Sequence, residues 1–147
     1  MCSEFLLTGI QKYNFQELQV QNRKDFEYIL RGYLDNGVWV VAEDYVGTGI
    51  AWGMAAGIDQ ILLENMNSEL YKEDLAIFLD GERFISGIEK EHTHEQDNLL
   101  TEKCRFAHQK LAKEKGWTPV CANAKKEEIH QFVRNIVTTT FNLRAAA

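Results

Sequence analysis

The sequence has no apolar run long enough to span a membrane and no phosphate-binding loop. None of its apolar stretches reaches the roughly 18 residues that a transmembrane helix needs, so no membrane partner is expected. No segment matches G-x-x-x-x-G-K-[ST], the loop that cradles the β- and γ-phosphates of a nucleoside triphosphate. A chain without this loop is predicted to lack the usual means of holding ATP.

Positive charge and cysteine are also scarce. The chain has 16 Lys and Arg against 22 Asp and Glu, a net charge of -6 over 147 residues. Nucleic acid is therefore not an expected partner, because its backbone requires a positive surface. Cys2, Cys104 and Cys121 are widely spaced and form no C-x-x-C, which indicates reduced thiols in a cytoplasmic protein. There is no linker-like segment, so residues 1–147 are predicted to form a single domain.

Apolar periodicity predicts helices alternating with strands. Phe26, Ile29, Leu30, Tyr33 and Leu34 follow the spacing of an amphipathic helix, and Asn36-Gly37 should end it. Such alternation implies right-handed crossovers and an α/β fold, with a parallel sheet flanked by helices. Helices are expected at 26–34, 51–65, 95–116 and 129–137, and strands at 38–42, 74–80 and 117–123, the last an edge or a strand start because of Pro119.

Acidic and amide residues follow the predicted strands. They are Glu43-Asp44, Asp80 and Asn123, and ligands of open parallel sheets bind beyond the carboxyl ends of the strands. We therefore expect these strand ends to share one mouth. The segment "GVWVVAEDYVGTGIAWG", residues 37–53, adds a glycine-spaced turn before a helix N-terminus, which favours an anion. An ordinary strand-to-helix connection, with the acids as helix caps, explains the same residues.

Three other residue patterns are better explained by structural roles than by ligand binding or catalysis. G-x-G-x-x-x-G is one residue too long for a dinucleotide fingerprint. His92 and His94 alternate with glutamates in the polar segment 86–98, but no distant Cys or His pair completes a metal site, so a solvated loop is the better interpretation and no metal site is predicted. Cys104 and His108 are four residues apart, yet Cys104 lies in an apolar stripe and is expected to be core.

In order and spacing, three stretches resemble the thymidylate kinase family. "NRKDFEYILRGYLDNGVWVVAEDYVGTGIAWG" is similar to the family's helix with Asn/Asp-Arg, its strand closing with Asp-Arg-Tyr and its small-residue turn. "EDLAIFLDGERF" is similar to the Pro-Asp-Leu-x-x-x-Leu-Asp strand that leads to the lid. "GWTPVCANAKKEEIHQFVRNIV" is similar to the last strand, the adenine-side loop and the closing helix. The resemblance covers nearly the whole chain.

The resemblance implies a role for each matching residue. Glu43 and Asp44 take the catalytic positions, Glu43 near magnesium and the phosphates. Arg23 faces the base, while Tyr45, Thr48 and Gly49 line the monophosphate pocket and Trp52 lies beside the sugar and base. The phosphate donor's adenine is approached by Asn123, Ala124 and Lys125, and the lid-like segment 86–98 and its surroundings carry Arg83, Lys90, His92 and His94.

Two departures limit what the resemblance implies. The family's first strand, P-loop, first helix and second strand have no counterpart, and Asp44 replaces the arginine of Asp-Arg-Tyr. That replacement removes an anion clamp and adds repulsion. The expected fold is thus an incomplete nucleoside-monophosphate-kinase-like fold that is a poor kinase alone. We expect one of three arrangements: a P-loop-bearing partner chain that supplies the missing half, self-association along the open strand edge, or a chain that is a fragment of a longer reading frame.

These residues are consistent with two functions. The first is a nucleotide-binding protein that transfers phosphoryl from ATP, with magnesium, to a nucleoside monophosphate only when another chain supplies the P-loop. The second is a non-catalytic interaction or regulatory subunit that needs no cofactor. The missing P-loop and Asp44 motivate the second.

Overall fold

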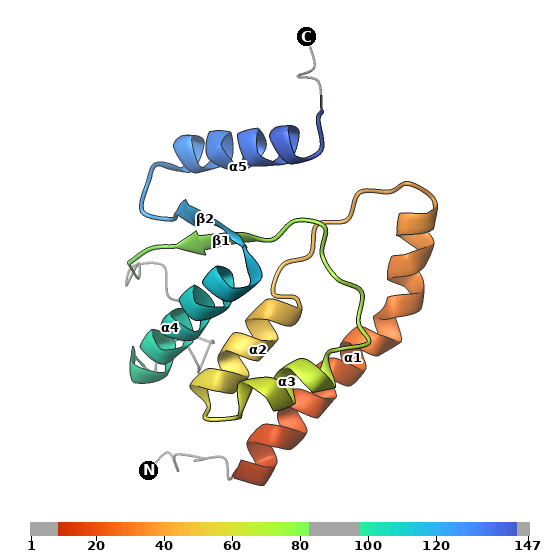
Figure 1. Ribbon diagram of the computed structural model, residues 1–147, viewed down its shortest axis with the longest axis vertical. Coiled ribbons are helices and arrows are strands. Elements are labelled where there is room, and N and C mark those ends of the chain that lie inside the picture. The colour runs from red at the N-terminus through yellow and green to blue at the C-terminus, as the bar shows by residue number, and fades with distance from the viewer. Residues whose placement is uncertain (1–8, 83–97, 144–147) are drawn as a thin grey trace, which may run out of the picture. The chain divides into compact units, whose positions relative to one another are not determined.

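The computed structural model describes residues 9–82 and 98–143. Contacts divide the chain into two compact units, residues 1–72 and 73–147, and each is considered by itself. Figure 1 labels the elements of both. No helix in the described ranges is both long and apolar enough to cross a membrane. The single domain over residues 1–147 stays a prediction.

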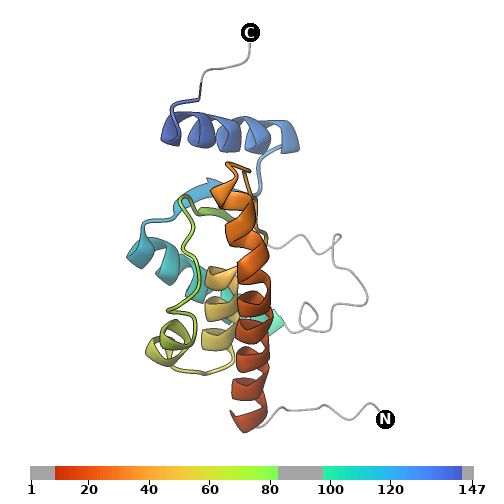
Figure 2. The same ribbon diagram turned by 90° about the vertical axis from the view of Figure 1, so that its right-hand side faces the viewer.

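The first unit is helical. Its long helix α1 (Gly9–Asp35) packs against α2 (Val46–Ala55) and the short α3 (Gln60–Met66), and α2 packs on α3. Figures 1 and 2 both show α2 running beside α1. The buried hydrophobic side chains come from all these elements and from the segment that follows α3; they are Val20, Leu30, Ile50, Ala51, Leu63 and Leu70.

The predicted end of α1 is confirmed. The helix finishes at Asp35, and Gly37 has a φ of 71°, a left-handed conformation that glycine adopts without steric cost. The Asn36 side chain donates to the carbonyl oxygen of Gly32 at 2.8 Å and so satisfies one of the last-turn acceptors.

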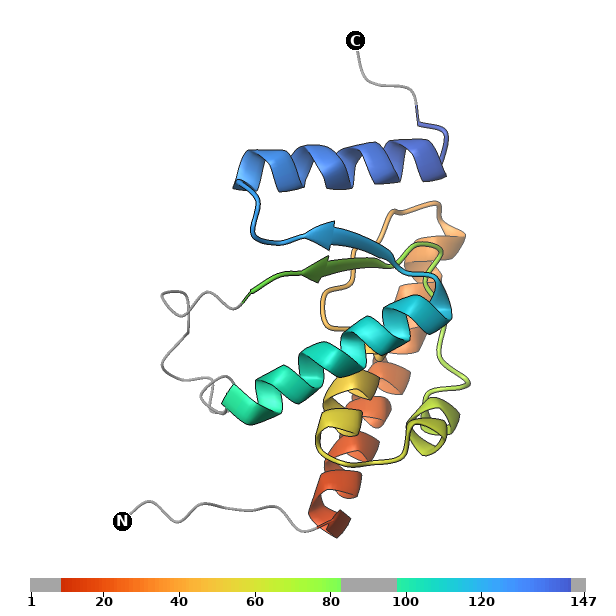
Figure 3. The same ribbon diagram turned by 60° about the vertical axis from the view of Figure 1, so that its left-hand side comes forward.

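The second unit contains a small parallel sheet. Strands β1 (Ile77–Asp80) and β2 (Thr118–Cys121) pair from Ile77 with Thr118 to Asp80 with Cys121. Helix α4 (Asn98–Lys115) connects them and packs on β1, while α5 (Lys126–Thr140) packs on β2. Figure 3 shows α4 and α5 on opposite sides of the strand pair. Both strands are edges of this sheet, which suits the predicted edge position of Pro119.

The predicted fold is wrong, both as an α/β fold with a helix-flanked parallel sheet and as an incomplete nucleoside-monophosphate-kinase-like fold. The described residues are mostly helical, and their only sheet has two strands. Residues 38–42, expected to be a buried strand, pair with no described strand, and Val41 is 97% exposed. A β-favouring run becomes a strand only when a neighbouring strand completes its ladder of hydrogen bonds. The predicted site, in which the ends of all three strands meet, is therefore absent from the described residues.

The glycine-spaced segment forms a helix where a turn was expected. Gly47, Gly49 and Gly53 all lie inside α2, which starts five residues before the predicted 51–65 helix. That predicted helix is in fact two, because Gly57 has a φ of 93° and breaks the chain direction before α3. Asp59 then caps α3 by accepting the N–H of Leu62 at 3.2 Å.

Candidate functional site

Several residues predicted to bind the substrate share one face of α2. Tyr45 is its N-cap, and Thr48, Gly49 and Trp52 follow at the third, fourth and seventh positions after it. Residues at this spacing lie on the same side of an α-helix. Each of them is partly exposed, so the face is open to solvent in part. The helix aligns them because it already begins at Val46, whereas the predicted helix began at residue 51.

Arg23 extends from α1 onto this face. Its Nη2 donates to the carbonyl oxygen of Tyr45 at 3.3 Å. A Cβ at position 49 would lie 2.5 Å from Nη2 and 3.1 Å from Cζ of Arg23, so the guanidinium rests directly on Gly49. A side chain at position 49 would displace the guanidinium from this face of α2. The structure thus brings together Arg23, which the resemblance assigned to the base, with Tyr45 and Gly49, which it assigned to the monophosphate pocket.

Asn67, at the end of α3, is a further member that the sequence analysis missed. Nη1 of Arg23 donates to its Oδ1 at 3.5 Å, and its own Nδ2 donates to the carbonyl oxygen of Leu63 at 2.8 Å. Asn67 is buried, with 6% of its surface exposed. In the sequence, the Asn- and Ser-rich stretch around position 67 signals only the end of a helix, and nothing in it points to Arg23.

Within the described ranges, the Arg23 guanidinium has no carboxylate partner. Burial lowers the pKa of Arg23 from its ordinary value, and the nearby Tyr45 opposes that effect. Both of its hydrogen-bond acceptors are neutral, and no carboxylate in residues 9–82 or 98–143 forms an ion pair with it. A guanidinium offers five donors, so an anion could still bind here. The first-turn N–H groups of α2 lie in the same part of the unit.

Glu43 and Asp44 do not end a strand, contrary to the prediction. They form an exposed bend immediately before α2, and Asp44 has a φ of 52°. A left-handed conformation is uncommon for residues other than glycine, although aspartate tolerates it better than most. Across the part of the chain that the structure describes, no cluster of His, Cys, Asp and Glu is suited to a metal ion.

Asp80 is held at the end of β1 in the second unit. Its two carboxylate oxygens accept from Arg105 Nε at 2.8 Å and from Gln109 Nε2 at 2.9 Å. The bond from Arg105 is the main reason that the pKa of Asp80 lies below its ordinary value. With both oxygens engaged by α4, this carboxylate ties the helix to the strand, which is a structural role.

The predicted adenine-side residues also lie in the second unit. The Asn123 amide pairs with the backbone of Glu82, accepting its N–H at 2.6 Å and donating to its carbonyl oxygen at 3.0 Å. A Cβ at Gly81 would meet this side chain at 2.6 Å. Ala124 and Lys125 lead into α5, and the Lys125 N–H donates to Glu128 Oε2 at 3.1 Å. The Asn123 side-chain amide, which was predicted to approach adenine, is therefore already hydrogen-bonded to the backbone of Glu82.

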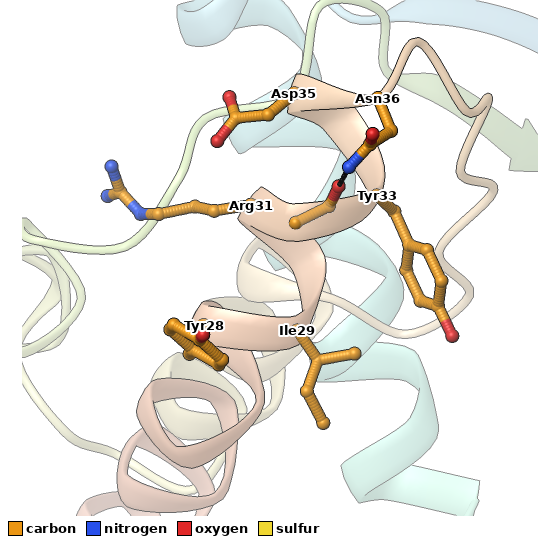
Figure 4. Close-up of a pocket in the computed structure, with 7 residues that line it drawn as sticks. Tyr28, Ile29, Arg31, Tyr33, Asp35 and Asn36 are labelled. Atoms are coloured by element: carbon orange, nitrogen blue, oxygen red, sulfur yellow. Dashed lines mark hydrogen bonds between the residues drawn. The ribbon is translucent and has the colours of Figure 1, made fainter.

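The remaining predicted site residues cannot be placed near Arg23, and a pocket on α1 lies apart from the predicted site residues. Arg83, Lys90, His92 and His94, and the segment 86–98 apart from its last residue, lie outside the described residues. Figure 4 shows a pocket along the last turns of α1, with Ile29 and Tyr33 on one side of the helix and Arg31 on the other. None of the predicted site residues lines that pocket.

No known protein-family model matches the chain.

Proposed function

We propose that this protein binds a nucleoside monophosphate in its first unit, and that it transfers phosphoryl from ATP only with a P-loop supplied by another chain. The observation that supports this proposal is the convergence of Arg23 with Tyr45 and Gly49, on the helix face that also carries Thr48 and Trp52. A partly buried guanidinium with neutral partners is stabilised by an anion, and a phosphate is the anion that the resemblance to thymidylate kinases suggests.

In this proposal the phosphate meets the first turn of α2. The amides of that turn and the guanidinium of Arg23 supply the positive potential, while Trp52, further along the same face, offers its ring to the sugar and base. The resemblance assigns Arg23 to the base; its contact with Gly49 in α2 supports a role in holding the phosphate as well.

Catalysis would need components from outside the described site. Magnesium and ATP would come with the P-loop partner, and Glu43 would order metal-bound water while the γ-phosphoryl passes to the monophosphate. A cytoplasmic location belongs to the same proposal. Asn123, Ala124 and Lys125 are assigned to the donor's adenine only through the resemblance, and Asn123 would first have to release Glu82.

Calorimetric titration of thymidine monophosphate tests the binding proposal. We expect heat with the natural chain and at least a roughly tenfold lower affinity for Arg23→Gln, because the charge-assisted contact is lost. Arg31→Gln is the matched control, since Arg31 lies on the same helix but is ion-paired with Glu27 at 2.9 Å. No heat with the natural chain, or equal losses in both variants, would contradict the proposal.

A second candidate is a non-catalytic interaction subunit. Asp44 favours it, because an exposed carboxylate directly before α2 repels an incoming phosphate. This candidate predicts no turnover when a P-loop chain is added, whereas restored kinase activity would eliminate it. Asp44→Arg separates the two further, because nucleotide affinity should rise only if the site recognises phosphate.

A further inference from the structure

The side chain of Asn67, at the end of α3, is held in one orientation. Its Nδ2 donates to the carbonyl oxygen of Leu63 at 2.8 Å, and its backbone N–H donates to the carbonyl oxygens of Leu63 and Glu64 at 3.3 and 3.2 Å. Asn67 is also buried. Because the amide nitrogen is bound to a carbonyl group, the amide oxygen is left to accept a different donor, and that donor is Nη1 of Arg23 at 3.5 Å.

The chain that follows Asn67 is fixed to α1 as well. The N–H of Tyr71 donates to Glu27 Oε1 at 3.0 Å, and Cζ of Arg31 lies 5.7 Å from the centre of the Tyr71 ring. Leu70, between Asn67 and these contacts, is buried. With the end of α3 on one side and α1 contacts on the other, the amide of Asn67 has a fixed place from which to meet Arg23.

Two neutral oxygens direct the guanidinium of Arg23. Nη1 donates to Asn67, and Nη2 donates to the carbonyl oxygen of Tyr45 at 3.3 Å, so each terminal nitrogen makes one bond. These bonds restrict rotation about Nε–Cζ, and the group lies against Gly49 in this orientation. A guanidinium has five N–H donors, so the two bonds leave three for a ligand, as far as the described part of the first unit shows.

An amide suits position 67 because the position needs one donor and one uncharged acceptor. The amide donates to the carbonyl of Leu63 and accepts from Arg23. A carboxylate has nearly the same shape, but it cannot donate to a carbonyl, and it would form an ion pair with the guanidinium. An apolar side chain would make neither bond. The asparagine therefore orients the guanidinium without neutralising it.

We propose that Asn67 is the positioning residue of the Arg23 site: it sets the direction of the guanidinium and leaves the positive charge to a phosphate. The ligand in this inference rests on the proposed function, whereas the orientation of Arg23 does not. The inference adds the end of α3 to a site that the resemblance builds from α1 and α2 alone. It also makes the uncharged state of residue 67 a condition for binding.

Nitrogen-15 NMR of the Arg23 guanidinium tests the orientation without a ligand. Restricted rotation about Nε–Cζ should give separate Nη1 and Nη2 signals in the natural chain, and Arg23→Gln identifies these signals by removing them. In Asn67→Ala we expect the two signals to merge, because free rotation averages them. Asn65→Ala, at an exposed position of the same helix, is the control and should keep them separate. Separate signals in Asn67→Ala, or merged signals in the natural chain, would overturn the proposal.

Calorimetry with thymidine monophosphate tests the role of charge. We expect about a fivefold loss of affinity for Asn67→Ala and about tenfold or more for Asn67→Asp, because the carboxylate also neutralises Arg23. Asn65→Asp adds the same charge at the exposed position and should change affinity little. Equal losses in Asn67→Asp and Asn65→Asp would overturn the proposal.

A double-mutant cycle separates positioning from a general structural effect. In an Arg23→Gln background, Asn67→Ala should cost no further affinity, because its effect passes through the guanidinium. The same loss in both backgrounds would show a structural role only. If thymidine monophosphate gives no heat with the natural chain, the proposed function fails, and the NMR signals of Arg23 still decide whether Asn67 positions it. Circular dichroism checks that each variant is folded.

Discussion

At the residue scale, Gly49 determines where Arg23 lies. An alanine Cβ at this position would approach Nη2 of Arg23 to 2.5 Å, so the guanidinium must move off the face of α2. For Gly49→Ala we expect about a tenfold loss of thymidine monophosphate affinity, measured by calorimetry. The change in stability should stay within about 2 kcal/mol, because alanine's better helix propensity offsets part of the crowding.

Gly32→Ala is the control for Gly49→Ala. Gly32 lies inside α1, and a Cβ there would have nothing within 4 Å. This variant should gain about 0.5–1 kcal/mol of stability and keep its nucleotide affinity. Equal affinities for Gly49→Ala and the natural chain would show that the position of Arg23 does not matter for binding.

Asp80 is the residue whose titration should affect stability. Its folded pKa lies below the ordinary value of 3.8, mainly because of the hydrogen bond from Arg105. A lowered folded pKa contributes stability that is fully present above the unfolded pKa and is lost as the pH falls through the folded pKa. Asp80→Asn should therefore cost about 1 kcal/mol or less near pH 7 and make stability less sensitive to pH below about 4.

Urea unfolding of the natural chain and of Asp80→Asn between about pH 2 and pH 7 measures this dependence. The two stability curves should converge as the pH falls through the acidic range, since protonation of Asp80 removes the same interaction that the substitution removes. Curves that stay parallel throughout would mean that the contact with Arg105 contributes nothing to the stability of the second unit.

At the element scale, the packing of α2 on α3 depends on Gly53. A Cβ there would meet two methyl groups of Leu63 at 2.7 Å, and Leu63 is fully buried, so its side chain has no free space to enter. We expect Gly53→Ala to destabilise the first unit by about 1–3 kcal/mol through overpacking. Thermal unfolding followed by circular dichroism measures the loss.

A double-mutant cycle identifies the cause of that loss. Leu63→Ala alone should cost about 2–5 kcal/mol because it leaves a cavity. In the Leu63→Ala background the added methyl at position 53 fills space, so Gly53→Ala should no longer destabilise. Purely additive effects would show that the two side chains do not meet.

At the scale of the whole molecule, the two compact units should respond separately to core mutations. Their cores come from different stretches of chain, with Leu63 in the first and Leu111 in the second. Gly53→Ala should speed amide hydrogen exchange in α1, α2 and α3, whereas Leu111→Ala should speed it in α4, β1 and β2. Mass spectrometry of peptic fragments resolves these regions. Faster exchange throughout the chain in either variant would show a single cooperative unit.

Local rules allowed several elements to be predicted from sequence. Apolar residues at helical spacing mark α4 and α5, and Asn36-Gly37 marks the end of α1. The β1–α4–β2 order follows from a short apolar run, an amphipathic helix and a second run. In each case the pattern lies within one segment, so that neighbours in sequence supply the contacts that decide the structure.

Only the tertiary structure decided the rest. The run at 38–42 has strand residues but no strand partner among the described residues, and whether a partner exists cannot be read from the run itself. Asn67 accepts a hydrogen bond from Arg23, 44 positions earlier in the chain. Gly49 leaves space for the guanidinium of the same arginine, which belongs to another helix. The sequence by itself determined where α1 ends and where α4 and α5 lie. Folding decided which side chains meet, because contacts between distant segments depend on the packing of the whole unit.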